Sequence, residues 1–120
     1  MSRIIRAVNS MISQKEKISN VLKRQSECFF LFDKKYKWSI LHRSDTDSYI
    51  LYYYSGDISL EVLASMDDFE WDNFKDYVMY SSSEIKTIEA HDTFAELYLI
   101  VKEIAHGVDK VLDDIIGSEF

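Results

Sequence analysis

The sequence contains no proline, only three glycines and a single cysteine, Cys28, among its 120 residues. A lone cysteine excludes an intramolecular disulfide and is typical of a reducing compartment, so we expect a cytoplasmic protein. No run of about 20 apolar residues predicts a membrane-spanning helix, and the basic N-terminus lacks the apolar region and cleavage site of a signal peptide. The length fits one domain, residues 1–120, and we expect no membrane partner.

Signatures of catalysis and of cofactor binding are also scarce. None of the three glycines lies in a phosphate-binding or dinucleotide-binding loop. Glu103 and His106 have the spacing found in di-metal carboxylate sites, but the second motif that such sites need is missing. Asp68, Glu70 and Asp72 alternate as in a calcium-binding loop, without its glycine or its distal glutamate. We therefore expect no cofactor, no bound metal and no enzymatic activity.

Charge is distributed unevenly along the chain. The net charge is −7, yet residues 1–43 contain ten basic and three acidic side chains, whereas residues 44–120 contain four basic and eighteen acidic ones. The densest acidic stretch runs from Asp57 to Asp76. The chain as a whole lacks the basic footprint of a nucleic-acid-binding domain. We therefore expect a basic protein as the partner, steered by these carboxylates, and no nucleic acid.

Hydrophobic periodicity predicts an N-terminal helix followed by a series of strands. Apolar residues at helical spacing predict an amphipathic helix over residues 3–24. Short aromatic-rich or alternating segments between turn residues predict strands. These strands are residues 27–33, 36–42, 48–54 and 76–82. Residues 58–65 fit either a strand or a short helix, and we favour a strand, while residues 66–74 are expected to form an acidic loop.

The C-terminal part of the sequence predicts one long helix. Thr93 and Glu96 have the spacing of a capping box, and apolar residues recur every seven positions from Phe94 onward. Gly107 would lie inside this helix, where a close contact would explain it, and Gly117 would end it. The expected fold class is α+β, with an N-terminal helix, an antiparallel sheet of four to five strands and a long C-terminal helix. Both helices would cover one face of the sheet, giving a two-layer sandwich.

Aromatic side chains accompany the acidic residues. Tyrosine and tryptophan dominate the energetic centres of protein interfaces, because they bury a large area at low entropy cost. Four aromatic residues are interleaved with the carboxylates of residues 57–77, and residues 48–54 contain four tyrosines. The alternative is a sheet face that simply tolerates exposed tyrosine. The predicted partner-binding residues are Asp67, Asp68, Phe69, Glu70, Trp71, Asp72, Asp76, Tyr52 and Tyr54.

A small, acidic, cysteine-poor protein of this kind resembles, in composition and outline, the bacterial immunity proteins that neutralise toxins. The resemblance implies a non-catalytic antitoxin that binds and blocks a basic toxin domain, for example a nuclease. A helix followed by strands also resembles type III secretion chaperones, which implies a secreted effector as partner. A third interpretation is a small enzyme in which His91, Asp92 and Glu96 converge with His42, within a concave pocket of perturbed titratable groups. We expect a monomer or a weak dimer.

Overall fold

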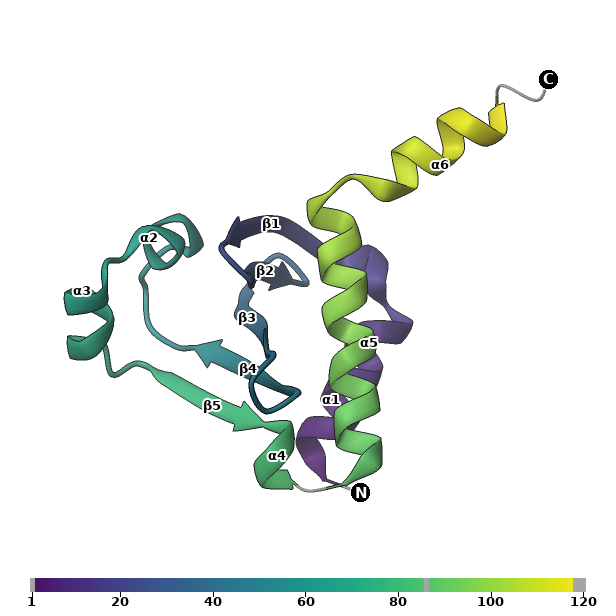
Figure 1. Cartoon of the computed structure of the whole chain (residues 1–120). Coiled ribbons are helices and arrows are strands. Elements are labelled where there is room, and N and C mark those ends of the chain that lie inside the picture. The colour runs from purple at the N-terminus through teal and green to yellow at the C-terminus, as the bar shows by residue number, and fades with distance from the viewer. Residues whose placement is uncertain (1, 86, 118–120) are drawn as a thin grey trace.

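A computed structural model describes residues 2–85 and 87–117 of the chain. Five antiparallel strands form one sheet in the sequential order β1-β2-β3-β4-β5, and the two long helices α1 and α5 cover one of its faces (Figure 1). The predicted α+β fold class is confirmed. The strands are β1 Ile18–Arg24, β2 Glu27–Phe32, β3 Tyr36–Arg43, β4 Ser48–Tyr54 and β5 Tyr77–Ser81. The helices are α1 Arg3–Ser13, α2 Leu60–Ser65, α3 Asp68–Asn73, α4 Ser82–Ile85, α5 Ile88–Ala105 and α6 Val108–Gly117.

The main core lies between the sheet and helices α1 and α5. Side chains alternate between the two faces of a strand, so every second residue of β2, β3 and β4 points into this core. The most enclosed side chains are Val8, Phe30, Ile40, Leu51, Phe94, Leu97 and Val101. Cys28 belongs to the same core, and its burial raises the pKa of the thiol. This cysteine is therefore a small buried apolar side chain.

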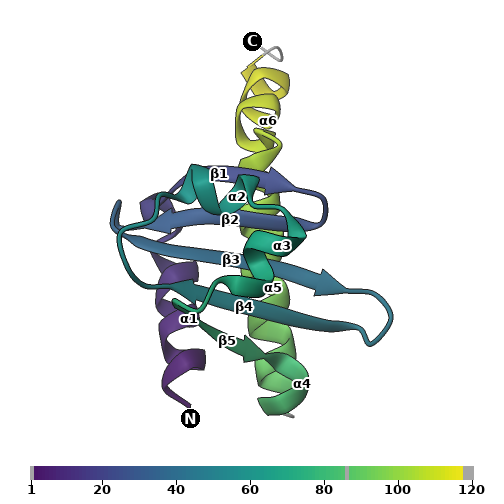
Figure 2. The ribbon, with the colours of Figure 1, turned by 90° about the vertical axis from the view of Figure 1, so that its left-hand side faces the viewer.

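The opposite face of the sheet is partly covered by two short helices, α2 and α3 (Figure 2). Phe29 of β2 and Tyr54 of β4 pack there against Leu60 and Leu63 of α2 and against Met66, which follows it. Each of these helices has only six residues. They therefore cover part of this face, and a pocket occupies the space beside α3.

Residues 18–24 form strand β1 instead of the second half of the predicted N-terminal helix, so that half of the prediction is wrong. The chain leaves α1 through the 3-10 turn Lys15–Lys17 and then pairs with β2. The pairing register shifts within β1, where Asn20 has a φ of 54°. Such a β-bulge inserts one extra residue into a strand. As a result Ile18 and Val21, three residues apart, pack on the same core and imitate helical spacing.

Two further segments are helical where we expected a strand and a loop. Residues 58–65 contain α2, which the hydroxyl of Ser59 caps by accepting a hydrogen bond from the first turn, so the favoured strand is wrong and the short helix is correct. Residues 66–74 contain α3, so the expected loop is wrong as well. In α3 the Asp67 carboxylate accepts from the Glu70 amide, and the Glu70 carboxylate accepts from the Asp67 amide. This capping box satisfies backbone donors that would otherwise have no partner in so short a helix.

The long C-terminal helix begins earlier than predicted and is divided in two. Helix α5 starts at Ile88, where the Thr87 hydroxyl accepts a hydrogen bond from the Ala90 amide. The capping box predicted at Thr93 is therefore wrong, and that side chain is buried within the helix. Gly107 has a φ of 64° and follows the end of α5. A Cβ there would meet no atom within 4 Å, so the left-handed backbone explains the glycine and the expected close contact does not.

Helix α6 projects from the body of the molecule, whose longest extent is 54 Å (Figures 1 and 2). The predicted apolar rows consequently cover the sheet only within α5, whereas Val111 and Leu112 of α6 are about half exposed. The helix reaches Gly117, and the stop predicted there falls next to residues 118–120, which lie outside the described range. None of the described helices combines the length and the hydropathy that a membrane span requires.

The covering of the second sheet face by α2 can be tested with two neighbouring truncations. Leu63 is fully buried against Phe29 and Tyr54, so Leu63→Ala should lower the free energy of unfolding by about 2–5 kcal/mol. Val62, in the same helix, is 46% exposed, and Val62→Ala should change it by no more than about 0.5 kcal/mol. Urea unfolding monitored by circular dichroism measures both values. Equal effects of the two substitutions would contradict the packing of α2 on the sheet.

Candidate functional site

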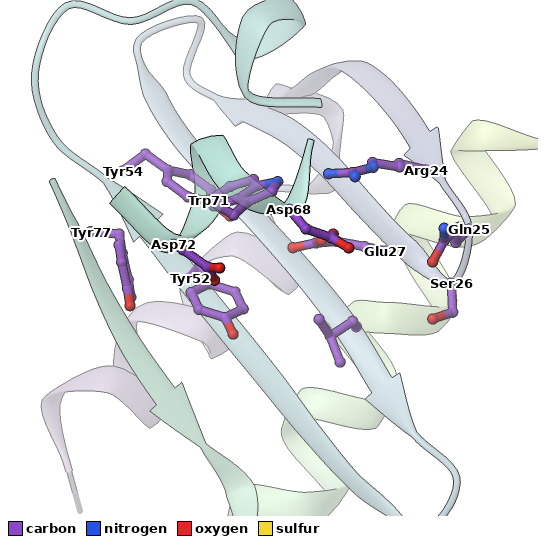
Figure 3. A pocket seen from close by; sticks show the side chains of 11 residues that line it. Arg24, Gln25, Ser26, Glu27, Tyr52, Tyr54, Asp68, Trp71, Asp72 and Tyr77 are labelled. Carbon is purple, nitrogen blue, oxygen red and sulfur yellow. The ribbon is translucent and has the colours of Figure 1, made fainter. Parts of the chain in front are cut away.

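A pocket of about 420 Å³ lies on the sheet face that α2 and α3 partly cover (Figure 3). Its walls come from α3, from all five strands and from the turn that joins β1 to β2. The lining residues are Arg24, Gln25, Ser26, Glu27, Leu41, Tyr52, Tyr54, Asp68, Trp71, Asp72 and Tyr77. Three of them are carboxylates and only one is a cation, so the pocket is acidic as well as aromatic.

A chain of hydrogen bonds connects three strands at this pocket. The Oγ atom of Ser39 on β3 donates to Oε2 of Glu27 on β2 at 2.6 Å, and it lies 2.7 Å from the hydroxyl of Tyr54 on β4. The strand register makes each pair diagonal neighbours on the same sheet face. When Glu27 is ionised, Ser39 donates its single proton to the carboxylate, so the Tyr54 hydroxyl is then the donor to Ser39. The chain of donors is therefore aligned toward the Glu27 carboxylate.

The position of Glu27 changes its proton affinity. Burial raises the pKa of Glu27 above its ordinary value of 4.5, while the hydrogen bond from Ser39 and the charge of Arg24 act in the opposite direction. Burial also raises the pKa of Tyr54 far above its usual range, so this hydroxyl keeps its proton and remains a donor. Glu27 is thus a half-buried carboxyl that holds a proton more readily than an exposed glutamate does. A cation that approached it would favour the ionised form.

The rings around the pocket form a continuous aromatic cluster. Trp71 of α3 stacks on Phe29 with 6.3 Å between the ring centroids, and its centroid lies 5.8 Å from that of Tyr54. Tyr52 and Tyr77 meet edge to face at 5.6 Å. Aromatic pairs at such distances add stabilisation beyond the area that they bury. The aromatic cluster therefore holds α3 against the sheet, and Trp71 and Tyr52 remain partly exposed on the pocket wall.

The exposed surface of α3 and of its N-terminal cap is acidic and carries one large apolar ring. Asp67, Asp68, Glu70 and Asp72 are all exposed, and the Phe69 side chain is 75% exposed. We call these five residues the acidic α3 surface. Asp68 and Glu70 lie in the first turn, where the helix dipole favours negative charge, so the same residues that make the surface acidic also support the helix.

The structure brings most of the predicted partner-binding residues together. Five of them line the pocket, namely Tyr52, Tyr54, Asp68, Trp71 and Asp72. The others on the acidic α3 surface, Asp67, Phe69 and Glu70, lie next to it. Asp76 lies outside the pocket lining, and its backbone carbonyl accepts a hydrogen bond from the Ser55 amide. Tyr54 is only 1% exposed, so the expectation of a surface ring at this position is wrong, and its hydroxyl acts through Ser39.

Sequence reasoning missed Glu27 and Arg24, which occupy opposite positions in the register of β1 and β2, on either side of the turn. Arg24 lies in the segment predicted to be helical, and a helix over residues 3–24 is incompatible with the hairpin that joins β1 to β2. No local pattern connects Glu27 with Ser39 and Tyr54, because the three residues come from three different strands. The one available signal is a glutamate at the head of an otherwise apolar strand, directly before Cys28.

Three of the four residues of the enzyme interpretation also lie near one another, away from the pocket lining. Nε2 of His42 is 2.9 Å from Oδ1 of Asp47, and Nε2 of His91 is 3.7 Å from Oδ2. Nδ1 of His91 lies 3.6 Å from Asp92, and no ion pair or hydrogen bond within the described ranges joins Glu96 to them. The hydrogen bond from His42 is the main cause that lowers the pKa of Asp47. In the described part of the chain, no three His, Cys, Asp or Glu side chains are grouped to hold a metal ion.

Comparisons of the chain with protein-family models, with curated proteins and with solved structures found no match. Because one fold can host many functions, the α+β architecture does not define an activity. The pocket and the acidic α3 surface are therefore the features that bear on function.

The raised pKa of Glu27 has a consequence for stability. Above pH 4.5, and up to the folded-state pKa of Glu27, the folded chain holds a proton that the unfolded chain has released. The contribution of Glu27 to the free energy of unfolding is therefore present at low pH and is lost as pH rises through this window. Glu27→Gln removes the titration, so the stability of this variant relative to the wild type should increase from pH 4.5 upward. Urea unfolding of both proteins at a series of pH values measures the difference.

The matched control for this measurement is Glu103→Gln, because Glu103 is exposed on α5 at the other side of the sheet. The pH dependence of this control should follow that of the wild type. Parallel curves for the wild type and Glu27→Gln would contradict the argument that burial raises the pKa of Glu27.

Proposed function

We propose that the protein is a non-catalytic module that binds a basic protein partner through the acidic α3 surface and the pocket beside it. The observation that carries this proposal is the 75% exposed ring of Phe69 among four exposed carboxylates. Protein interfaces combine aromatic anchors, which lose water on binding, with charge that complements the partner. The aromatic cluster fixes α3 on the sheet, so these groups are positioned before the partner arrives, which lowers the entropic cost of association.

The resemblance to immunity proteins extends the proposal to the class of partner. The partner would be a toxin domain with a basic cleft, and the acidic α3 surface with its one apolar ring would occupy this cleft. The protein would act as a monomer or weak dimer. The buried free thiol of Cys28 supports a reducing, cytoplasmic setting. A secretion chaperone remains the alternative. Such a chaperone holds an extended segment in apolar grooves, and the carboxylates that line this pocket favour the toxin partner.

Charge reversal on α3 tests the proposal. We expect the wild-type protein to retain a basic protein from a lysate of its native host at low salt, and to release it as the salt concentration rises. The double variant Asp68→Lys/Asp72→Lys should retain at most roughly one tenth of the partner that the wild type retains, because like charges then face each other across the interface. Quantitative mass spectrometry of the retained proteins measures the ratio.

The control for this experiment carries the same change of charge at the far end of the molecule. Asp113 and Asp114 are exposed on α6, and Asp113→Lys/Asp114→Lys should retain the partner as the wild type does. Equal retention by the α3 variant, or an equal loss in the α6 control, would remove the acidic α3 surface from the interface.

One observation favours a second candidate function, that of a small enzyme. The structure contains a concave pocket with perturbed titratable groups, Glu27, Tyr52 and Tyr54, which is the feature that the enzyme interpretation expects. The pKa values of both tyrosines are raised, so these hydroxyls stay protonated at neutral pH. Glu27 is therefore the perturbed group that would transfer a proton.

Hydrolysis assays separate this candidate from the binding module. If Glu27 is a general acid, the wild-type protein should hydrolyse at least one member of a panel of phosphate esters, carboxylic esters and glycosides. Glu27→Gln should then reduce the rate of hydrolysis by about 10²-fold or more. Equal rates for the wild type and Glu27→Gln on every substrate would count against an enzyme at this pocket.

A further inference from the structure

We propose that the pocket accepts the guanidinium group of an arginine side chain, with Glu27 as its counter-ion and the aromatic cluster as its stacking surface. The source of the arginine rests on the proposed function, since the basic partner would supply it, whereas the recognition of a guanidinium group rests on the pocket alone.

The pocket has an excess of carboxylates. Glu27, Asp68 and Asp72 line it from β2 and α3, and Arg24 is the single cationic residue among its lining residues. Within residues 2–85 and 87–117, Arg24 forms no ion pair with any of these carboxylates. A cationic guest would therefore find carboxylates that the protein's own basic side chains do not neutralise by direct contact. A half-buried carboxylate interacts with such a guest more strongly than an exposed one, because solvent screens it less.

The walls of the pocket suit a flat cation. Trp71, Tyr52 and Tyr77 line it with rings that are partly exposed (Figure 3). A guanidinium group is planar and weakly hydrated, and it stacks on aromatic faces while its edge donates hydrogen bonds. A lysine ammonium is a compact, strongly hydrated charge and gains less from such walls. The five donors of a guanidinium group can also serve carboxylates that come from different elements, as Glu27 and Asp72 do.

The hydrogen bonds of Glu27 leave part of its carboxylate available. Ser39 donates to Oε2, and Tyr54 supports Ser39 from behind. This arrangement fixes the orientation of the carboxylate before a guest enters. A guanidinium group near Glu27 would favour the ionised carboxyl, so binding would be accompanied by release of the proton that burial helps Glu27 to hold.

The pH dependence of the affinity for a guanidinium group is determined by all the charged and titratable groups around Glu27. These groups are Arg24 from β1, Ser39 from β3, Tyr52 and Tyr54 from β4, Tyr77 from β5, and Asp68 and Asp72 from α3. Burial raises the pKa values of Tyr52 and Tyr54, so these two hydroxyls keep their protons at mildly acidic pH. Affinity for the guanidinium group should rise with pH as Glu27 ionises, and the part of this rise that Glu27 supplies should be absent from Glu27→Gln.

The probe for the test is N-acetyl-arginine amide, which carries the guanidinium group without a second charge. Titrated into the 120-residue chain and followed by NMR, it should produce saturable shifts at residues that line the pocket. Glu27→Gln should weaken its binding roughly tenfold or more, whereas Glu103→Gln should leave it unchanged. The citrulline analogue of the probe has the same shape without the charge, and it should bind at least tenfold more weakly. The lysine analogue should also bind more weakly than the arginine probe.

Asp72→Asn is a second variant, because Asp72 is exposed on α3 and contributes to the pocket without belonging to the Glu27 hydrogen-bond chain. It should weaken probe binding less than Glu27→Gln and should do so chiefly at low salt. Three results would overturn the proposal: equal binding of the citrulline analogue, unchanged affinity in both pocket variants, or shifts that map away from the pocket.

The same experiments distinguish failure of this inference from failure of the proposed function. A partner retained through the acidic α3 surface, together with a probe that does not bind the pocket, would preserve the binding module and overturn the arginine pocket. A probe that binds in a Glu27-dependent way, in a protein that retains no partner, would preserve the guanidinium site and overturn the proposed function.

Discussion

The whole molecule depends on one constraint, which is that a twisted sheet with apolar side chains on both faces has to be covered on both faces. Helices α1 and α5 are long enough to do this on one side. On the other side, Phe29 and Tyr54 are covered by two helices of six residues each, drawn from the connection between β4 and β5. Because this cover is short, the second face has both a small core and, beside it, a pocket that opens between α3 and the β1–β2 turn.

The pocket combines features that oppose one another energetically. Removing a carboxylate from water is unfavourable. The hydrogen bond from Ser39 and the charge of Arg24 offset part of this cost for Glu27, because both favour its ionised form. A core made only of apolar residues would need none of these compensations, so a glutamate here weakens the fold at neutral pH. Residues that reduce stability, and whose charge neighbouring groups partly compensate, are typical of sites that serve binding or catalysis. Both the guanidinium site and the alternative enzyme draw on this same residue.

Much of the fold could be predicted from the sequence because the relevant signals are local. Period-two patterns and the turns between them placed β2, β3 and β4 within a residue of their observed bounds. The bulge at Asn20 concealed β1, since it shifted the apolar residues to a helical spacing. Asp67 and Glu70 have the spacing of a capping box, so the sequence does contain a local signal for α3, although the acidic residues favoured the prediction of a loop. The pocket was not readable, because Glu27, Ser39 and Tyr54 meet only when three strands pair in register, and no spacing along the chain encodes that.

The order of the strands also bears on how the chain folds. Strands β1 to β4 form a meander in which each strand pairs with its neighbour in sequence through a short turn. Residues 55–76, which carry α2 and α3, form the one long connection within the sheet, and closing a longer loop costs more entropy. We therefore expect the meander to form early, and the segment that completes the pocket to dock late and to open before the rest of the protein unfolds.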